Sequence, residues 1–180
     1  MKPQTSLRRD RGFTMIEILV TLVVTAVGML GLAGFVVRAT TLSTDSIQRG
    51  RAAMLVNDMA ARISDHKAIA ANFVNADDTN IQLRGAAVVS CAGLAGAPLQ
   101  LCQWNNLLAG ANDGGSGAAF LGYRGCVTRL AGEPVYIVTV TWGSLTPGAP
   151  PVDQCGANEF GNESQRRVLR LQVRVANLTA

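Results

Sequence analysis

The longest apolar pattern of the chain runs from Phe13 to Val37. These 25 residues are apolar or small, with four exceptions: Thr14, Glu17, Thr21 and Thr25. At about 1.5 Å per residue a helix of this length covers roughly 37 Å, which exceeds the hydrocarbon core of about 30 Å in a bilayer. The pattern therefore predicts a transmembrane helix over residues 13–37.

The next stretch has the pattern of an amphipathic helix. Leu55, Met59 and Ile63 recur at four-residue spacing and alternate with charged positions, which places them on one helical face. No proline lies between Pro3 and Pro98, so no residue forces the first helix to stop. We expect the helix to continue over residues 38–72 and to pack its apolar face on a domain.

Residues 73–180 show short units with turn signals, as in a small mixed domain. Apolar and polar residues alternate in Val135–Trp142 and again in Arg167–Val175, and both stretches predict strands. The even-numbered residues of the first strand share one face and its odd-numbered residues share the other. In the second strand the odd-numbered residues from 169 are expected to face inward. These features predict an α+β head in which a small antiparallel sheet lies on the amphipathic half of the long helix.

Other segments of the head give weaker signals. Ile81–Leu83 and Ala86–Ser90 are predicted as short strands, and Leu99–Gly110 as a short helix that carries Trp104. Ala111–Ala118 is rich in glycine and polar residues, and its composition is typical of a flexible loop.

Charge is concentrated at the N-terminus. The net charge of the chain is +4, and residues 1–12 contribute +3 of it through Lys2, Arg8, Arg9 and Arg11 against Asp10. The rest of the chain carries +1, so net charge does not indicate nucleic acid as a partner, although a local patch could bind it. Four arginines are close in the last strand, and we interpret them as a solvated strand face: Arg166, Arg167, Arg170 and Arg174.

All four cysteines follow the apolar run: Cys91, Cys102, Cys126 and Cys155. An even number of cysteines in such a region predicts disulfides in an oxidising compartment. A zinc site is not expected, because there is no CxxC pair and the only histidine, His66, is far from the cysteines in sequence. Three pairings are open, and proximity favours Cys91 with Cys102 and Cys126 with Cys155.

The charges that flank the apolar run predict its orientation. Four basic residues precede the run, whereas only Arg38 closely follows it. By the positive-inside rule the N-terminus is cytoplasmic and the head lies outside, in the periplasm if the membrane is an inner membrane. A cleaved secretory signal has an apolar region of about 7 to 15 residues, so this run is too long for one.

A glutamate near the start of this apolar run requires an explanation, because a charge at the centre of a membrane helix costs roughly 2.5 to 3.5 kcal/mol on insertion scales. The local sequence is Arg-Gly-Phe-Thr-Met-Ile-Glu, from Arg11 to Glu17, after a short basic leader. This combination resembles the prepilin cleavage and methylation motif of type IV pilins and type II secretion pseudopilins. Met15 stands where leucine is commonest in that motif.

The resemblance implies a role for three residues. A prepilin peptidase is expected to cut between Gly12 and Phe13, to remove the leader, residues 1–12, and to methylate the new amine of Phe13. The carboxylate of Glu17 is expected to pair with the amine of a neighbouring subunit when helices pack in a filament. Such a pair fixes the register of neighbouring helices more than it stabilises the filament. The alternative is that Glu17 extends to the lipid headgroups.

Residues 28–34, 52–63 and 136–142 resemble minor pilins of the type IV pilus modification family, the PilV-type proteins. The resemblance implies a subunit that helps other minor pilins and the major pilin to prime pilus assembly. It is expected in the inner membrane first and then in or at the tip of the extracellular pilus, supporting adhesion, twitching motility or DNA uptake. The nearest alternative is a minor pseudopilin of a type II secretion system.

A membrane-tethered extracytoplasmic enzyme is a hypothesis of another class. His66 is isolated from other catalytic residue types except Asp65, and Asp77 and Asp78 are adjacent, in the pattern of a turn rather than of an acid/base pair. We therefore expect no catalytic residues, no metal site and no cofactor, and we interpret the chain as a structural subunit.

Overall fold

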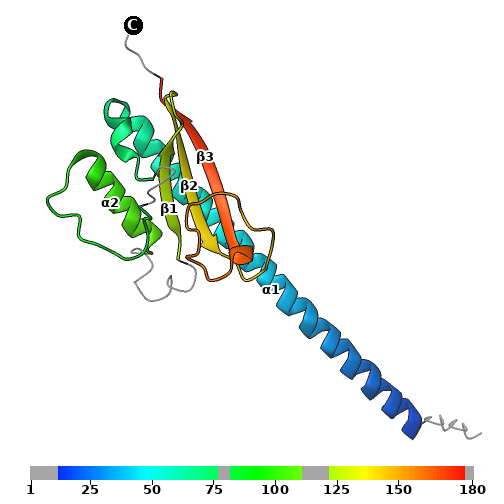
Figure 1. Ribbon diagram of the computed structural model, residues 1–180. Coiled ribbons are helices and arrows are strands. Elements are labelled where there is room, and N and C mark those ends of the chain that lie inside the picture. The colour runs from blue at the N-terminus through cyan, green and yellow to red at the C-terminus, as the bar shows by residue number, and fades with distance from the viewer. Residues whose placement is uncertain (1–11, 77–81, 111–121, 177–180) are drawn as a thin grey trace, which may run out of the picture. The chain divides into compact units, whose positions relative to one another are not determined.

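The computed structural model describes residues 12–76, 82–110 and 122–176. The chain divides into two compact units, Met1–Leu42 and Ser43–Ala180. Helix α1, Met15–Asp65, forms the described part of the first unit and begins the second. The elements that follow all belong to the second unit (Figure 1). They are η1 (Lys67–Phe73), α2 (Gly96–Leu108), β1 (Arg124–Arg129), β2 (Val135–Gly143), η4 (Glu163–Gln165) and β3 (Arg166–Arg174).

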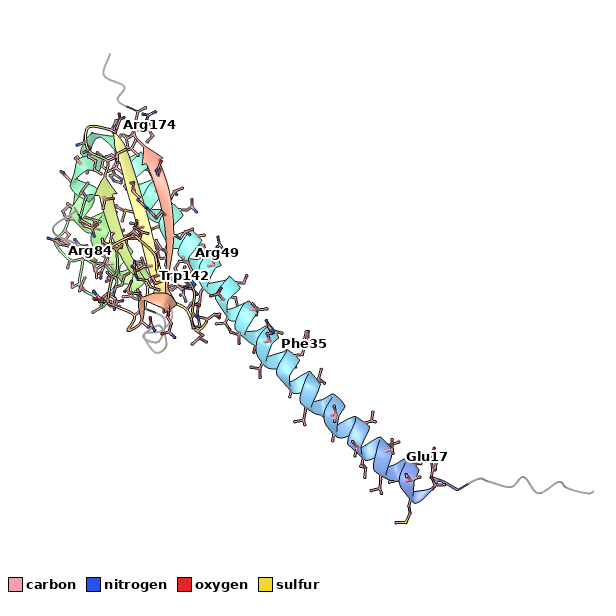
Figure 2. The ribbon with its side chains drawn as sticks, turned by 45° about the vertical axis from the view of Figure 1, so that its right-hand side comes forward. Glu17, Phe35, Arg49, Arg84, Trp142 and Arg174 are labelled. Atoms are coloured by element: carbon pink, nitrogen blue, oxygen red, sulfur yellow. A yellow bond between two sulfur atoms is a disulfide. The ribbon has the colours of Figure 1, made fainter. Side chains whose placement is uncertain are left out.

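In the first unit α1 is an apolar helix whose side chains project on all sides (Figure 2). It is long and apolar enough to cross a membrane, with a mean hydropathy of 2.3 in its most apolar window. The hydroxyls of Thr21 and Thr25 donate to the carbonyls of Ile18 and Thr21 at 2.8 and 2.9 Å. Because the helix satisfies these hydroxyls itself, they do not oppose an apolar environment.

The second unit packs the C-terminal half of α1 against a three-stranded antiparallel sheet (Figure 1). The strands are β1 (Arg124–Arg129), β2 (Val135–Gly143) and β3 (Arg166–Arg174), in the order β1-β2-β3. The predicted stripe of α1 is buried, as are the even-numbered residues of β2 from 136 to 142. The prediction of an α+β fold, a long helix packed on a small antiparallel sheet, is confirmed.

Helix α2, Gly96–Leu108, packs beside this core through Trp104. The ring is fully buried, and its Nε1 donates to the carbonyl of Leu55 in α1 at 2.9 Å. Gly125 of β1 leaves room for the same ring, because a Cβ at that position would collide with it. The predicted helix around Trp104 is thus confirmed, and it begins earlier than expected.

Helix α1 ends at Asp65, before the predicted end at residue 72. His66 leaves the α-helical conformation, with φ −109° and ψ 45°, and the 3₁₀ segment η1 follows over Lys67–Phe73. This change of conformation lets Ala70 and Phe73 turn into the core, where Phe73 is fully buried. Tertiary packing, rather than a proline or glycine, therefore ends the α-helix.

The short strand predicted over Ala86–Ser90 is wrong, since this stretch is irregular and exposed. Asparagines of α2 satisfy its backbone instead. Asn105 accepts from the N–H of Gly85 at 2.8 Å, and Asn106 accepts from and donates to the backbone of Val89 at 2.9 and 2.8 Å. Near the other predicted strand, Ile81–Leu83, the structure has a single bridge from Arg84 to Gly125, and Ile81 lies outside the described residues. The predicted loop Ala111–Ala118 lies outside them too.

The outer face of the sheet, opposite α1, is covered in part by the segment 144–165. Thr139 and Thr141 of β2 lie on this outer face, and both are buried. Gly156 lets the covering segment approach, because a Cβ there would collide with the hydroxyl of Thr141. The sheet therefore has packed material on both faces.

Candidate functional site

The residues of the resemblance lie at the N-terminal end of α1. Gly12 and Phe13 precede the first helical residue, Met15, and Phe13 is 78% exposed. A Cβ added at Gly12 would meet no atom within 4 Å. The fold of this chain therefore does not require glycine at position 12. Any requirement for glycine there comes from another molecule that binds or processes the chain.

Glu17 lies in the first turn of α1 and is exposed (Figure 2). Its backbone N–H donates to the carbonyl of Thr14 at 3.1 Å, which starts the helix. A carboxylate in the first turn interacts favourably with the helix dipole, typically by 0.3 to 1 kcal/mol. No ion pair joins it to a cation among the described residues. Glu17 is thus the one acidic group in the apolar run, and the described part of the chain leaves its charge uncompensated.

The four cysteines form two disulfides in the second unit. Cys91 is joined to Cys102 and Cys126 to Cys155, with Cα–Cα distances of 5.8 and 6.0 Å. This is the pairing that proximity along the chain favours. The first disulfide ties the irregular stretch before α2 to that helix, and the second ties β1 to the segment that covers the outer face of the sheet.

The arginines of β3 do not form a free basic stripe. Arg166 is buried beside Glu163, Arg170 lies 3.2 Å from Asp153, and Arg174 lies 3.3 Å from Glu133. Figure 2 shows Arg174 at the end of the head that is far from Trp142. Each of these three charges has an acidic neighbour, and Arg167 donates to the carbonyls of Ser164 and Thr146. The strand therefore offers a nucleic acid much less charge than four free arginines would.

His66, the histidine weighed for an enzyme, contacts a backbone carbonyl and an aromatic ring. Nδ1 of His66 lies 2.9 Å from the carbonyl oxygen of Arg62, and the imidazole ring stacks obliquely with Phe73. Asp77 and Asp78 lie outside the described residues. Across the ranges that the structure describes, no group of three histidine, cysteine or acidic side chains could hold a metal.

Sequence reasoning missed one polar centre, which lies at Arg166. Its guanidinium donates to the carbonyls of Asp153 and Cys155 at 2.7 and 2.9 Å and to the Glu163 carboxylate at 2.6 Å. The Asn158 N–H donates to the same carboxylate, and together with Arg166 this bond holds the pKa of Glu163 below its usual 4.5. An acid three residues before an arginine was the available signal, but it is too common to indicate such a centre.

Comparison with known families decides the interpretation of the N-terminus. Residues 7–33 match the family described as the prokaryotic N-terminal methylation motif. The chain carries a prepilin methylation motif. The motif spans Gly12, Phe13 and Glu17 together with most of the exposed apolar helix, and it supports a type IV pilin or a pseudopilin, a structural subunit. It implies processing by a prepilin peptidase and assembly with other pilins. No curated protein and no solved structure matches the chain.

Proposed function

We propose that this chain is a minor type IV pilin of the PilV type, which helps to prime pilus assembly and then sits in or at the tip of the pilus. The observation that carries the proposal is the methylation motif running directly into an exposed apolar helix with one uncompensated carboxylate. An exposed apolar surface of this extent requires lipid or other apolar helices around it. The apolar helix of a pilin is surrounded first by lipid in the membrane and then by the apolar helices of other subunits in the filament.

The proposed site has three parts. Prepilin peptidase cuts between Gly12 and Phe13 and methylates the Phe13 amine. The carboxylate of Glu17 then pairs with the amine of a neighbouring subunit. Two observations support this assignment: the open space around Gly12 and the lack of an ion pair for Glu17 within the described chain.

The proposed location is the inner membrane, with the N-terminus in the cytoplasm and the head in the periplasm, before transfer to the extracellular pilus. The basic leader supports this orientation, and so do two disulfides that lie in the head and suit an oxidising compartment. The proposed partners are the prepilin peptidase, the other minor pilins and the major pilin.

The pairing of Glu17 is tested with the Glu17→Ala variant in a piliated host that lacks the wild-type chain. We expect the leader to be removed normally, because the cleavage site is intact, and we expect the subunit to be missing from sheared pili, because the neighbour's amine loses its counter-charge. Immunoblots of membranes and of sheared pili measure the two steps separately. Incorporation at the wild-type level would contradict the pairing.

Two further variants serve as controls. Thr21→Val changes a polar residue one turn further along the same helix, whose hydroxyl is bonded within the helix, so normal incorporation is expected. Gly12→Val is expected to keep the leader and to stop before incorporation. A pseudopilin is distinguished by deletion of the chain: loss of protein secretion with normal piliation would favour the secretion system over the pilus.

A further inference from the structure

A pocket of about 450 Å³ opens on the outer face of the sheet, opposite α1. Its floor includes a cross-strand row formed by Cys126, Thr139 and Arg170, and Thr128 and Ile137 form the next row. The turn after β1 and the segment 153–155 form its walls. The volume is within the range of small-ligand pockets, which is about 300 to 1,000 Å³.

The wall at 153–155 is held in place by two kinds of bond. The disulfide between Cys126 and Cys155 joins the floor to this wall. The guanidinium of Arg166 also donates to two carbonyls of this wall, those of Asp153 and Cys155. The pocket is therefore largely preformed, which lowers the entropic cost of binding a ligand.

At the polar end of the pocket, Arg170 is paired through one nitrogen and keeps its other donors unused. Nε of Arg170 lies 3.2 Å from Oδ2 of Asp153, and the other oxygen of Asp153 accepts from the Cys155 N–H at 2.8 Å. Asp153 thereby orients Arg170, while the two Nη groups bond to no residue in the described ranges. Thr139, which is only 2% exposed, also lines the pocket. A planar pair of N–H donors is the arrangement that binds a carboxylate through two parallel hydrogen bonds.

The remainder of the pocket is apolar. Ala76, Leu130, Ala131 and Ile137 line it beside the polar end. Its volume of about 450 Å³ is far larger than a single carboxylate group requires. A carboxylate ion alone would leave most of this space to water, so a fitting ligand carries apolar groups beside its carboxylate.

The guanidinium of Arg129 is directed elsewhere, although the residue lines the pocket. Its carbon lies 6.0 Å from the centre of the Tyr136 ring, on the core face of the sheet. Arg170, which is paired with Asp153 through Nε, is therefore the arginine whose remaining donors meet a ligand in this pocket.

We propose that the pocket binds a short acidic peptide segment of a partner protein. An aspartate or glutamate side chain of the segment lies on the Nη groups of Arg170, and its apolar neighbours pack on Ile137 and Leu130. This inference goes beyond the proposed function, because it concerns the head alone and holds for a pilin or a pseudopilin.

The test uses the full chain in detergent micelles and the peptide acetyl-Leu-Glu-Leu-amide, with calorimetry or NMR titration as the measurement. We expect saturable binding that weakens by about 10-fold or more in Arg170→Gln, because a hydrogen bond to a charged group contributes about 1.5 to 3 kcal/mol.

The matched control is Arg174→Gln, which removes an arginine from the same strand and face outside the pocket, and binding is expected to be unchanged. Thr139→Val should weaken binding by about 2- to 10-fold. Unchanged thermal midpoints of the variants, followed by tryptophan fluorescence, show that they fold.

Four results would overturn the proposal. The first is equal binding of the glutamine analogue, acetyl-Leu-Gln-Leu-amide, and the second is wild-type binding by Arg170→Gln. The third is succinate binding as tightly as the peptide, which would assign the pocket to a free small acid. The fourth is tighter peptide binding by the double variant Asp77→Asn, Asp78→Asn, which would assign the pocket to the chain's own acids after Ala76.

Discussion

At the scale of single residues, Arg166 shows how the head holds a charge inside. The residue is 2% exposed, and its guanidinium bonds to Glu163 and to the carbonyls of Pro151, Asp153 and Cys155. A buried cation is tolerated only when its charge and its donors are satisfied, and all these partners belong to the segment that covers the outer face of the sheet. Arg166 thereby fixes that segment to β3.

The Arg166→Met variant should lower the free energy of unfolding of the head by about 3 kcal/mol, because it leaves Glu163 and three carbonyls without their donor. Urea denaturation in mild detergent measures this, with fluorescence from the two tryptophans, both of which lie in the head. The control Arg174→Met removes an exposed arginine of the same strand and should change stability by no more than about 0.5 kcal/mol. Equal losses in the two variants would contradict the role of Arg166.

The carboxyl of Glu163 predicts a pH dependence. Its pKa in the folded head lies below the usual 4.5, chiefly through the Asn158 N–H and then through Arg166. The stabilisation is therefore present above about pH 4.5 and is lost as the pH falls through the lower folded pKa. The stability advantage of the wild type over Glu163→Gln should be larger at pH 7 than at pH 3. A constant or growing advantage toward pH 3, in the same denaturation experiment, would show that the carboxylate is not stabilised in this way.

Some residues could be identified from the sequence and others could not. Gly12, Phe13 and Glu17 belong to a short local pattern, so they are visible without a structure. Thr139 and Arg166 are buried by a segment that returns from a distance in sequence. Arg166 was interpreted as part of a solvated strand face, because no local pattern predicts which face such a segment covers.

At the scale of elements, β2 could be predicted from its local sequence pattern, whereas β1 depends on tertiary contacts. β2 alternates regularly, and its range was predicted almost to the residue. β1 was not predicted, because Gly125 and Cys126 have little intrinsic preference for a strand, and only Val127 and Thr128 favour one. Pairing with β2, the Cys126–Cys155 disulfide and the fit of Gly125 against Trp104 define this strand, and all three are tertiary interactions.

The two disulfides differ in the length of chain that they enclose. The separation is 29 residues for Cys126–Cys155 and 11 residues for Cys91–Cys102. In the chain-entropy model these loops correspond to about 3.6 and about 2.8 kcal/mol of stabilisation.

Replacing Cys126 and Cys155 by alanine should therefore lower the free energy of unfolding by about 3 to 4 kcal/mol, and slightly more than replacing Cys91 and Cys102. Because the Cys126–Cys155 disulfide joins the wall of the pocket to its floor, its removal should also weaken binding of the acidic peptide. Denaturation of both double variants and of the wild type measures the stability. A larger loss for the Cys91 and Cys102 variant would contradict the loop-length account.

At the scale of the whole molecule, the chain combines two units with opposite solvent requirements. The first is an apolar helix with nearly all of its side chains exposed, and the second is a head with its own core and two disulfides. The hydroxyls of Thr21 and Thr25 in the apolar run are satisfied within the helix, whereas Glu17 has no ion pair among the described residues. This division was readable from the sequence, because hydropathy over a long run does not depend on tertiary contacts.

The central claim is that the chain is made as a prepilin and processed at the Gly12–Phe13 bond. Intact-mass and fragment analysis of the chain, purified from membranes with and without a prepilin peptidase, tests it most directly. With the peptidase we predict a chain that lacks residues 1–12 and carries one methyl group on the amine of Phe13. The Gly12→Val variant should keep its leader. Its head should be as stable as that of the wild type, because the space around Gly12 is open. A chain that keeps Met1 in the presence of an active peptidase, or one cut at another bond, would contradict the claim.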